Sequence, residues 1–246
     1  MKKTLCAAAL AAALGWGAAA QADDGVIRIG FITDMSGLSA DADGPGGAEA
    51  IKMAIADFGG SVAGKKIEVL VADHQNRADI ASSRAREWLD QKGVNMLIAG
   101  ANSAAALAMA KVAEEKKTPF FVVSAGASEL TNSQCTPYTV HYVYDTVSLA
   151  RGTARAMLKE GNKDWFFLTV DHAFGQALER DASAVVTADG GTVKGRVRHP
   201  LNTADFSSFI LQAQASGATV LGLANSASDT SNAVKAAAEF GLTPKM

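Results

Sequence analysis

The chain has 246 residues, of which 48% are hydrophobic, 20% charged and 7% aromatic, and its formal net charge is −2. This composition excludes a disordered chain, a collagen-like fibre and a disulfide-framed mini-protein. The even charge balance argues against a nucleic-acid partner, because a nucleic-acid-binding protein carries a basic patch. The length suits one large domain or two small ones.

Residues 1–22 have the pattern of a secretory signal peptide. Lys2 and Lys3 precede an apolar stretch, and the sequence Ala20-Gln21-Ala22 stands before two acidic residues. A positive start, a short apolar core and a small-residue exit are typical of a segment that is removed on export. We therefore predict cleavage after Ala22, with an uncleaved membrane anchor as the alternative.

Short apolar strands alternate with helices after this segment. Such strands are typical of parallel sheets that are buried on both faces, and the helices have the length of βαβ crossovers. The predicted strands cover residues 26–33, 66–72, 95–99 and 119–123, and the predicted helices cover 48–58, 78–91 and 103–116.

The pattern pauses over residues 138–145, which we interpret as a crossing between two lobes. It then resumes with helices over 148–160, 174–188, 206–215 and 229–240, and strands over 165–170, 193–197 and 219–223. The predicted fold class is α/β, with two Rossmann-like lobes built on parallel sheets, over residues 23–143 and 144–246. A helix stop at 241–244 should lead into another strand, so we expect the C-terminal part of the second lobe to be missing.

The loops that follow the predicted strands are the candidate ligand site, because ligands of open parallel sheets bind beyond the carboxyl ends of the strands. These loops are rich in hydroxyls, amides and small residues, including Ser36, Asn102 and Ser103. The helix that begins at Ser103 offers free N–H groups and a positive dipole end, which suit a carboxylate. Ser128 can add a hydroxyl. The alternative for Asn102 and Ser103 is that they only cap this helix.

Signals for catalysis or metal binding are weak. The chain has four histidines and no Gly-x-Ser-x-Gly elbow, so a hydrolase triad has little support. No His-x-x-x-His spacing indicates zinc. After loss of Cys6 with the signal peptide, Cys135 is a buried free thiol or pairs with a cysteine outside this sequence. A catalytic thiol is disfavoured, because no helix start or cation prepares a thiolate there. We expect no cofactor and no metal.

Five segments, taken together in their order and spacing, resemble the periplasmic solute-binding proteins of ABC importers. The resemblance is to the type I, branched-chain amino acid (Leu/Ile/Val-binding) family and runs from about residue 27 to 244. The segments are IGFITDMSG at 29–37, GANSA at 100–104, SAGAS at 124–128, YVYDT at 142–146 and DHAFG at 171–175.

This resemblance implies a two-lobed protein in which the first lobe holds the ligand's carboxylate and ammonium and the second lobe closes over it. Ser103 and Ala104 would supply a helix-start contact, Gly126 backbone groups and Ser128 a hydroxyl. Phe174 stands at the family's tyrosine position and would stack on the ligand. The full set of predicted ligand-binding residues is Ser36, Asn102, Ser103, Ala104, Gly126, Ser128, Tyr144, Phe174 and Asn225.

The sequence departs from the family pattern at His141, where many members have arginine, and at Phe174, which lacks a phenol. The second lobe has no secure acidic residue for an ammonium group, and Asn225 lies near that place. Tyr144 could instead pack the hinge, and Phe174 could be ordinary core. His172 is predicted to be a solvated loop residue.

The predicted function is capture of a small solute in the periplasm by a monomeric binding subunit, which closes about a hinge and delivers the solute to ABC permease subunits. The solute could be an amino acid, an amide, a urea-type compound or an aromatic acid. The alternatives are a ligand-sensing receptor domain of the same fold and a periplasmic amidase-like enzyme.

Overall fold

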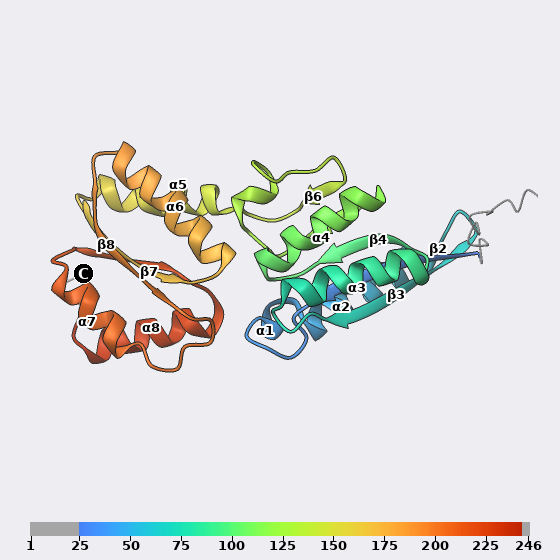
Figure 1. Cartoon of the computed structure of the whole chain (residues 1–246), viewed down its shortest axis with the longest axis horizontal. Helices are drawn as coiled ribbons and strands as arrows, with labels where there is room; N and C mark the ends of the chain where they lie inside the picture. Colours follow the sequence, from blue (N-terminus) through green and yellow to red (C-terminus); the bar gives the residue numbers. More distant parts are fainter. Residues whose placement is uncertain (1–24, 243–246) are drawn as a thin grey trace, which may run out of the picture.

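A computed structural model describes residues 25–242, which form two α/β lobes lying side by side along the long axis of the molecule (Figure 1). The predicted fold class is confirmed. The predicted signal peptide at residues 1–22 and the strand expected after residue 244 lie outside the described residues. The elements of the first lobe are β1 (Val26–Thr33), α1 (Ala40–Asp43), α2 (Pro45–Asp57), β2 (Ser61–Val62), β3 (Lys65–Asp73), α3 (Ala78–Gln91), β4 (Val94–Ala99), α4 (Ser103–Lys116), β5 (Phe120–Val122), the 3-10 helix η1 (Ser128–Leu130) and β6 (Thr139–His141).

The first lobe is built on a sheet whose strand order is β2-β3-β1-β4-β5-β6 among the described residues. Strands β3, β1, β4, β5 and β6 pair in parallel, and only β2 is antiparallel to its neighbour. Successive residues of β1 face opposite sides of this sheet. Ile32 lies in the apolar core under α3 and α4, whereas Phe31 contacts α2 at Gly47 on the other face. Because these strands pair in parallel, their carboxyl ends all lie at the same edge of the sheet.

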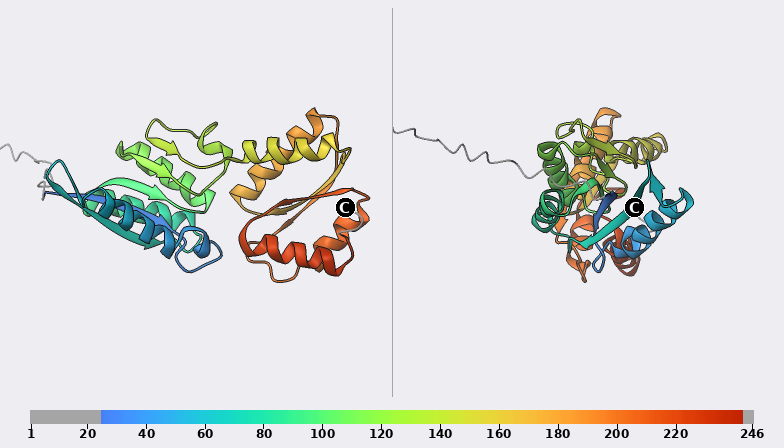
Figure 2. Two further views of the ribbon diagram at one scale, coloured as in Figure 1. Left: turned by 180° about the vertical axis from the view of Figure 1, so that it is seen from behind. Right: turned by 90° about the vertical axis from the view of Figure 1, so that its right-hand side faces the viewer.

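The second lobe has the same construction on a smaller scale, with strand order β8-β7-β9 among the described residues and parallel pairing throughout. Helices α5 and α6 cover one face of this sheet, and α7 and α8 cover the other (Figures 1 and 2). Its elements are α5 (Thr146–Lys159), β7 (Asp164–Val170), α6 (Ala173–Ala188), β8 (Thr192–His199), α7 (Ser207–Ala215), β9 (Val220–Ala224) and α8 (Ala227–Glu239).

The chain passes from the first sheet to the second between β6 and α5, and the predicted division at residues 143 and 144 falls in this connection. Asp145 begins the second lobe as the N-cap of α5: its carboxylate accepts from Ser148 N at 2.7 Å, and Ser148 Oγ accepts from Asp145 N in return. Such a reciprocal pair fixes the direction in which a chain enters a helix.

The predicted bounds of α3 and α4 match the structure, and most of the other long elements agree to within two residues at each end. The prediction begins α2 at residue 48, three residues too late, because Pro45, Gly46 and Gly47 are poor helix formers inside a helix. Pro45 is nevertheless well suited to the first turn, where its N–H would have no partner.

Cys135 is exposed and has no disulfide partner among the described residues, so the prediction of a buried thiol is wrong. Among the helices of residues 25–242, none combines the length and hydropathy needed to span a bilayer.

Replacing Leu97 by alanine is expected to destabilise the first lobe by about 3 kcal/mol, because Leu97 on β4 is fully buried in the core under α3 and α4. The measurement is the free energy of unfolding in urea. The control is Leu211→Ala, at a side chain 49% exposed on α7, for which a change within about 0.5 kcal/mol is expected. Equal losses for the two variants would contradict this assignment of the core.

Candidate functional site

A cavity of about 210 Å³ lies between the lobes, at the edge where the parallel strands of both sheets end. It is smaller than the roughly 300 Å³ at which pockets for drug-sized ligands begin, so it suits a small solute. The residues that line it are Leu38, Ser39, Ala42, Asn76, Ala101, Asn102, Ser103, Ser124, Ala125, Gly126, Tyr144, His172, Phe174, Leu201, Ser226 and Ala227.

A chain of side-chain hydrogen bonds holds the first-lobe wall of this cavity. The buried carboxylate of Asp34 accepts from Asn76 Nδ2 at 2.5 Å and from the N–H groups of Gly37 and Ser39 at 2.8 Å each. Asn76 Oδ1 in turn accepts from Asn102 Nδ2 at 3.1 Å. The loops after β1, β3 and β4 are therefore tied to one another by the protein's own side chains.

Asn102 is the last member of this chain and also the N-cap of α4, since its Oδ1 accepts from Ala105 N at 2.9 Å. Its φ of 107° lies in a region that non-glycine residues rarely adopt. Both ends of its amide are thus used within the protein. Asn102 lines the cavity, but its side chain bonds only to Ala105, where it caps α4, and to Asn76 of the neighbouring loop.

The start of α4 presents unused donors to the cavity. The N–H group of Ser103 is the first of the helix and has no intrahelical acceptor. The hydroxyl of Ser103 accepts from Ala127 N at 3.2 Å, which leaves its own hydrogen free to donate. This arrangement suits a carboxylate.

Gly100 and Asp43 set how closely the loop before α4 approaches the sheet. Asp43 accepts from Thr33 Oγ1 at 2.8 Å and from Ala101 N at 2.6 Å. A Cβ atom at position 100 would collide with both of these side chains, so only glycine fits there.

The second lobe contributes two ring side chains from the start of α6. His172 is half-buried and lines the cavity, so the prediction of a solvated loop residue is wrong. Burial, with a smaller contribution from nearby His74, lowers the pKa of His172. The ring of Phe174 approaches Gly126 of the first lobe so closely that a Cβ there would lie 3.3 Å from Phe174 Cε2 and 3.0 Å from Tyr144 Cε2.

Three helix N-termini therefore converge on the cavity: α4 through Ser103, α6 through His172 and α8 through Ser226. Each brings a partial positive charge of about half a unit. No Asp, Glu, Lys or Arg is among the described residues that line the cavity. The cavity thus favours an anion and offers no carboxylate to an ammonium group.

Five of the nine predicted site residues line the cavity: Asn102, Ser103, Gly126, Tyr144 and Phe174. Ser36 is exposed and donates to Asp73 Oδ2 at 2.6 Å, outside the cavity. Asn225 is buried in the second lobe, where it accepts from Thr230 Oγ1 at 2.8 Å, and its neighbour Ser226 reaches the cavity instead.

The hydroxyl of Ser128 is engaged away from the cavity by Asp181 and Arg180 of α6. Ala104 does not line the cavity either. The prediction that these two residues face the ligand directly has no support in the geometry.

Residues that the predicted set omitted include Leu38, Asn76 and Ser226. Each of them follows a strand at its carboxyl end, which is the signal that identified the others. Leu201 follows β8 in the same way.

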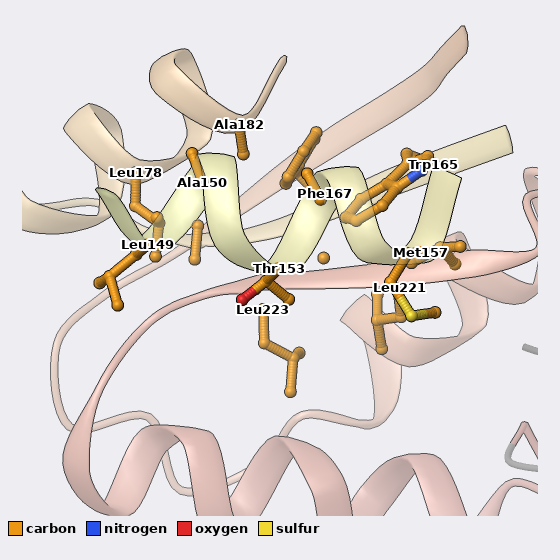
Figure 3. Close-up of a pocket in the computed structure, with 14 residues that line it drawn as sticks. Leu149, Ala150, Thr153, Met157, Trp165, Phe167, Leu178, Ala182, Leu221 and Leu223 are labelled. Atoms are coloured by element: carbon orange, nitrogen blue, oxygen red, sulfur yellow. The ribbon is translucent and has the colours of Figure 1, made fainter. Parts of the chain in front are cut away.

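A second, larger cavity of about 400 Å³ lies inside the second lobe, between α5 and β9, which is an edge strand among the described residues (Figure 3). Leu149 and Met157 of α5 and Leu223 of β9 are among the apolar side chains that line it, and Thr153 supplies the one side-chain hydroxyl. The indole N–H of Trp165 is already bonded to Asn162 O. This cavity lacks the converging polar groups that would orient a polar solute, so the interlobe cavity is the stronger candidate.

Residues 25–242 contain no group of three or more His, Cys, Asp or Glu side chains placed to hold a metal ion.

Two parallel-sheet lobes with a solute-sized cavity at their facing edges define a type I binding protein. The family model described as periplasmic binding protein matches residues 26–246, and the chain belongs to this family. The Leu/Ile/Val-binding protein homolog 6 of Brucella abortus is 30% identical over 202 residues, which cover 81% of this chain and 50% of that protein. The chain therefore spans about half the length of this curated relative.

Solved structures agree with this assignment. A periplasmic binding protein from Burkholderia mallei is 63% identical with a TM-score of 0.88, over 90% of this chain and 59% of that one. A solute-binding protein of an ABC transporter from Rhodopseudomonas palustris, in complex with 3,4-dihydroxybenzoic acid, is 29% identical with a TM-score of 0.78, over 89% and 60% of the two chains. These neighbours are solute-binding proteins, as the resemblance in sequence implied.

Replacing Asn102 by alanine is expected to cost about 2 kcal/mol of stability, because alanine loses the cap and must keep a strained φ. Asn102→Gly also loses the cap but adopts a positive φ without strain, so its cost should be about 1 kcal/mol lower. Unfolding in urea measures both. A glycine variant that is less stable than the alanine variant would contradict the assigned strain.

Acidification is expected to destabilise the protein through His74. Burial lowers the pKa of His74, whose Nδ1 accepts from Asn76 N at 3.1 Å while Nε2 donates to Ala101 O at 3.2 Å. The unfolded chain takes up a proton as the pH falls through about 6.5, before the native state does, so the unfolding free energy falls below that pH. Urea unfolding between pH 7.5 and 5 should show a weaker pH dependence for His74→Gln than for the wild type. Gln75→Ala is the control and should keep the wild-type slope, and an unchanged slope in His74→Gln would refute the assignment.

Proposed function

We propose that this chain captures a small carboxylic acid, of the aromatic type, as part of the periplasmic binding subunit of an ABC importer. The observation that carries this proposal is the convergence of three helix N-termini on a cavity whose described lining has no charged side chain. A carboxylate matches this field without a cation of its own. The ammonium of an amino acid would find no counter-charge there.

The rest of the cavity suits a flat apolar ring. The rings of Phe174 and Tyr144 both approach Gly126, and Leu38 and Leu201 add apolar surface from opposite lobes. Aromatic rings that stack or meet edge to face gain about 0.5–1.5 kcal/mol beyond the area they bury. The Rhodopseudomonas palustris protein in complex with 3,4-dihydroxybenzoic acid supports the same class of solute.

Capture would proceed by hinge closure. The solute's carboxylate would accept hydrogen bonds from Ser103 and from N–H groups at the helix starts, each contributing about 1.5–3 kcal/mol. Contacts from α6 and α8 exist only when the second lobe is close, so the solute favours the closed state by that difference in affinity. The closed monomer would then dock on the permease in the periplasm, without chemical change to the solute.

A thermal-shift panel on the full-length mature protein tests the solute class. At 100 times its Kd, a solute that binds only the native state stabilises it by about 2.7 kcal/mol. We expect 3,4-dihydroxybenzoate and benzoate to raise the melting temperature more than leucine, acetamide or urea. Phe174→Ala should weaken binding of the best acid about tenfold, whereas Tyr142→Ala, at a side chain 79% exposed and outside the cavity, should not.

Two outcomes would contradict the proposal. A larger rise in melting temperature with leucine than with any aromatic acid would favour an amino acid as the solute. Formation of a product from an amide, followed by mass spectrometry, would favour the amidase-like enzyme.

A further inference from the structure

A polar cluster joins the two lobes on the side where the chain crosses between them. Its members are Ser128 and Glu129 of the first lobe, Thr146 at the start of α5, and Arg180 and Asp181 of α6. We call these five residues the pivot cluster.

The carboxylate of Asp181 is the centre of the pivot cluster. It accepts from Ser128 Oγ at 2.8 Å and from Thr146 Oγ1 at 2.5 Å. Thr146 Oγ1 also accepts from Ser128 N at 3.1 Å, and Thr146 N donates to Gly126 O at 2.9 Å. Thr146 and Ser128 are buried, so these bonds are shielded from water.

Arg180 extends the cluster with a second bridge between the lobes. Its Nη2 donates to Ser128 Oγ at 2.8 Å, and its Nη1 pairs with Glu129 Oε1. The other oxygen of Glu129 is buried without a partner. Glu129 therefore depends on Arg180 for compensation of its charge, and loss of the guanidinium would force this part of the interface to rearrange.

The opposite rim of the cavity is different. There Leu38 and Ser39 of the first lobe lie across from Leu201 and Ser226 of the second. No hydrogen bond joins these two sides within the part of the chain that the structure describes. Among residues 25–242, the hydrogen bonds between the lobes thus gather on the side where the chain crosses.

Helix α6 connects the pivot cluster to the cavity. Phe174 and Asp181 are seven residues apart on it, which is two turns or about 10.5 Å, and so lie on one face of the helix. Because the helix is stiff over this length, the bonds that hold Asp181 also determine where Phe174 lies over Gly126.

We propose that the pivot cluster fixes the angle between the lobes and so sets the affinity for the solute without contacting it. Arg180 and Asp181 act as positioning residues. When the cluster is weakened, the lobes sample a wider range of angles and the binding-competent geometry is less populated. The apparent affinity falls in proportion to that population.

Interlobe distance in the ligand-free, full-length protein tests this directly. Spin labels at Lys52→Cys of α2 and Gln212→Cys of α7, both exposed, in a background whose native cysteines, Cys135 included, are replaced by serine, report the separation by double electron–electron resonance. We expect Arg180→Gln and Asp181→Asn to broaden or shift the distribution. The control Arg155→Gln removes an exposed ion pair with Asp189 inside the second lobe and should leave the distribution unchanged.

Affinity provides the second measurement, with 3,4-dihydroxybenzoate as the probe. Arg180→Gln should weaken binding at least fivefold while the control variant does not, and Arg180→Lys should recover part of the loss. Glu129→Gln removes the same ion pair with a smaller change of shape, and serves if the arginine variant does not fold. This second step rests on the proposed function, but the ligand-free distances do not.

An unchanged distance distribution in folded Arg180→Gln or Glu129→Gln would overturn the proposal. If the distances change and the acid does not bind even the wild type, the proposed solute is wrong and the pivot cluster stands.

Discussion

Backbone N–H groups without an acceptor, at the starts of α4, α6 and α8, are the feature on which the cavity depends. They provide positive potential without the desolvation cost of burying an arginine or lysine. The described lining has no charged side chain, and the carboxylates nearest to it, Asp34 and Asp43, are already bonded to donors of the first lobe. Under the proposed function the solute brings the negative charge, and the selection of an anion would follow from the fold rather than from one side chain.

Such donors select a ligand only if they are held in place beforehand. In the first lobe, the hydrogen bonds from Asp34 to Asn76 and from Asn76 to Asn102 hold the donors in place. Asn102 keeps its unusual φ because both ends of its amide are bonded. The conformational entropy of these loops is lost when the protein folds and not when the solute binds. Binding then loses less free energy to the ordering of loops, which is the advantage of a preorganised site.

The fold was predictable because its signals are local. Apolar runs such as 26–33 and helix periodicity such as 103–116 depend on neighbouring residues, and α4 has the predicted bounds. Short elements at the margins, such as β2 and β6, carry too few residues for a periodic signal. The rule that ligands lie beyond the carboxyl ends of strands also predicts the edge of the sheets at which the interlobe cavity lies.

The direction of individual side chains could not be read in the same way, because it depends on partners that are remote in sequence. Ser128 follows a strand as a ligand-binding residue should, but its hydroxyl bonds to Asp181, 53 residues away. The amide of Asn225 lies 3.5 Å from His199 Nε2, 26 residues away, and Ser226 lines the cavity in its place. The polar loop predicts a solvated His172, but its ring is half-buried at the wall of the interlobe cavity.

The two sides of the cavity have different roles in the proposed closure. Bonds around Asp181 join the lobes on the side of the crossing and do not involve a residue that lines the cavity wall opposite. The rim from Leu38 to Leu201 has no such bonds within the described residues, so a solute that contacts both lobes supplies the missing attraction. Only contacts of that kind can shift the population toward the closed state. A solute too small to reach both walls of the 210 Å³ cavity would bind the first lobe alone and leave the angle between the lobes unchanged.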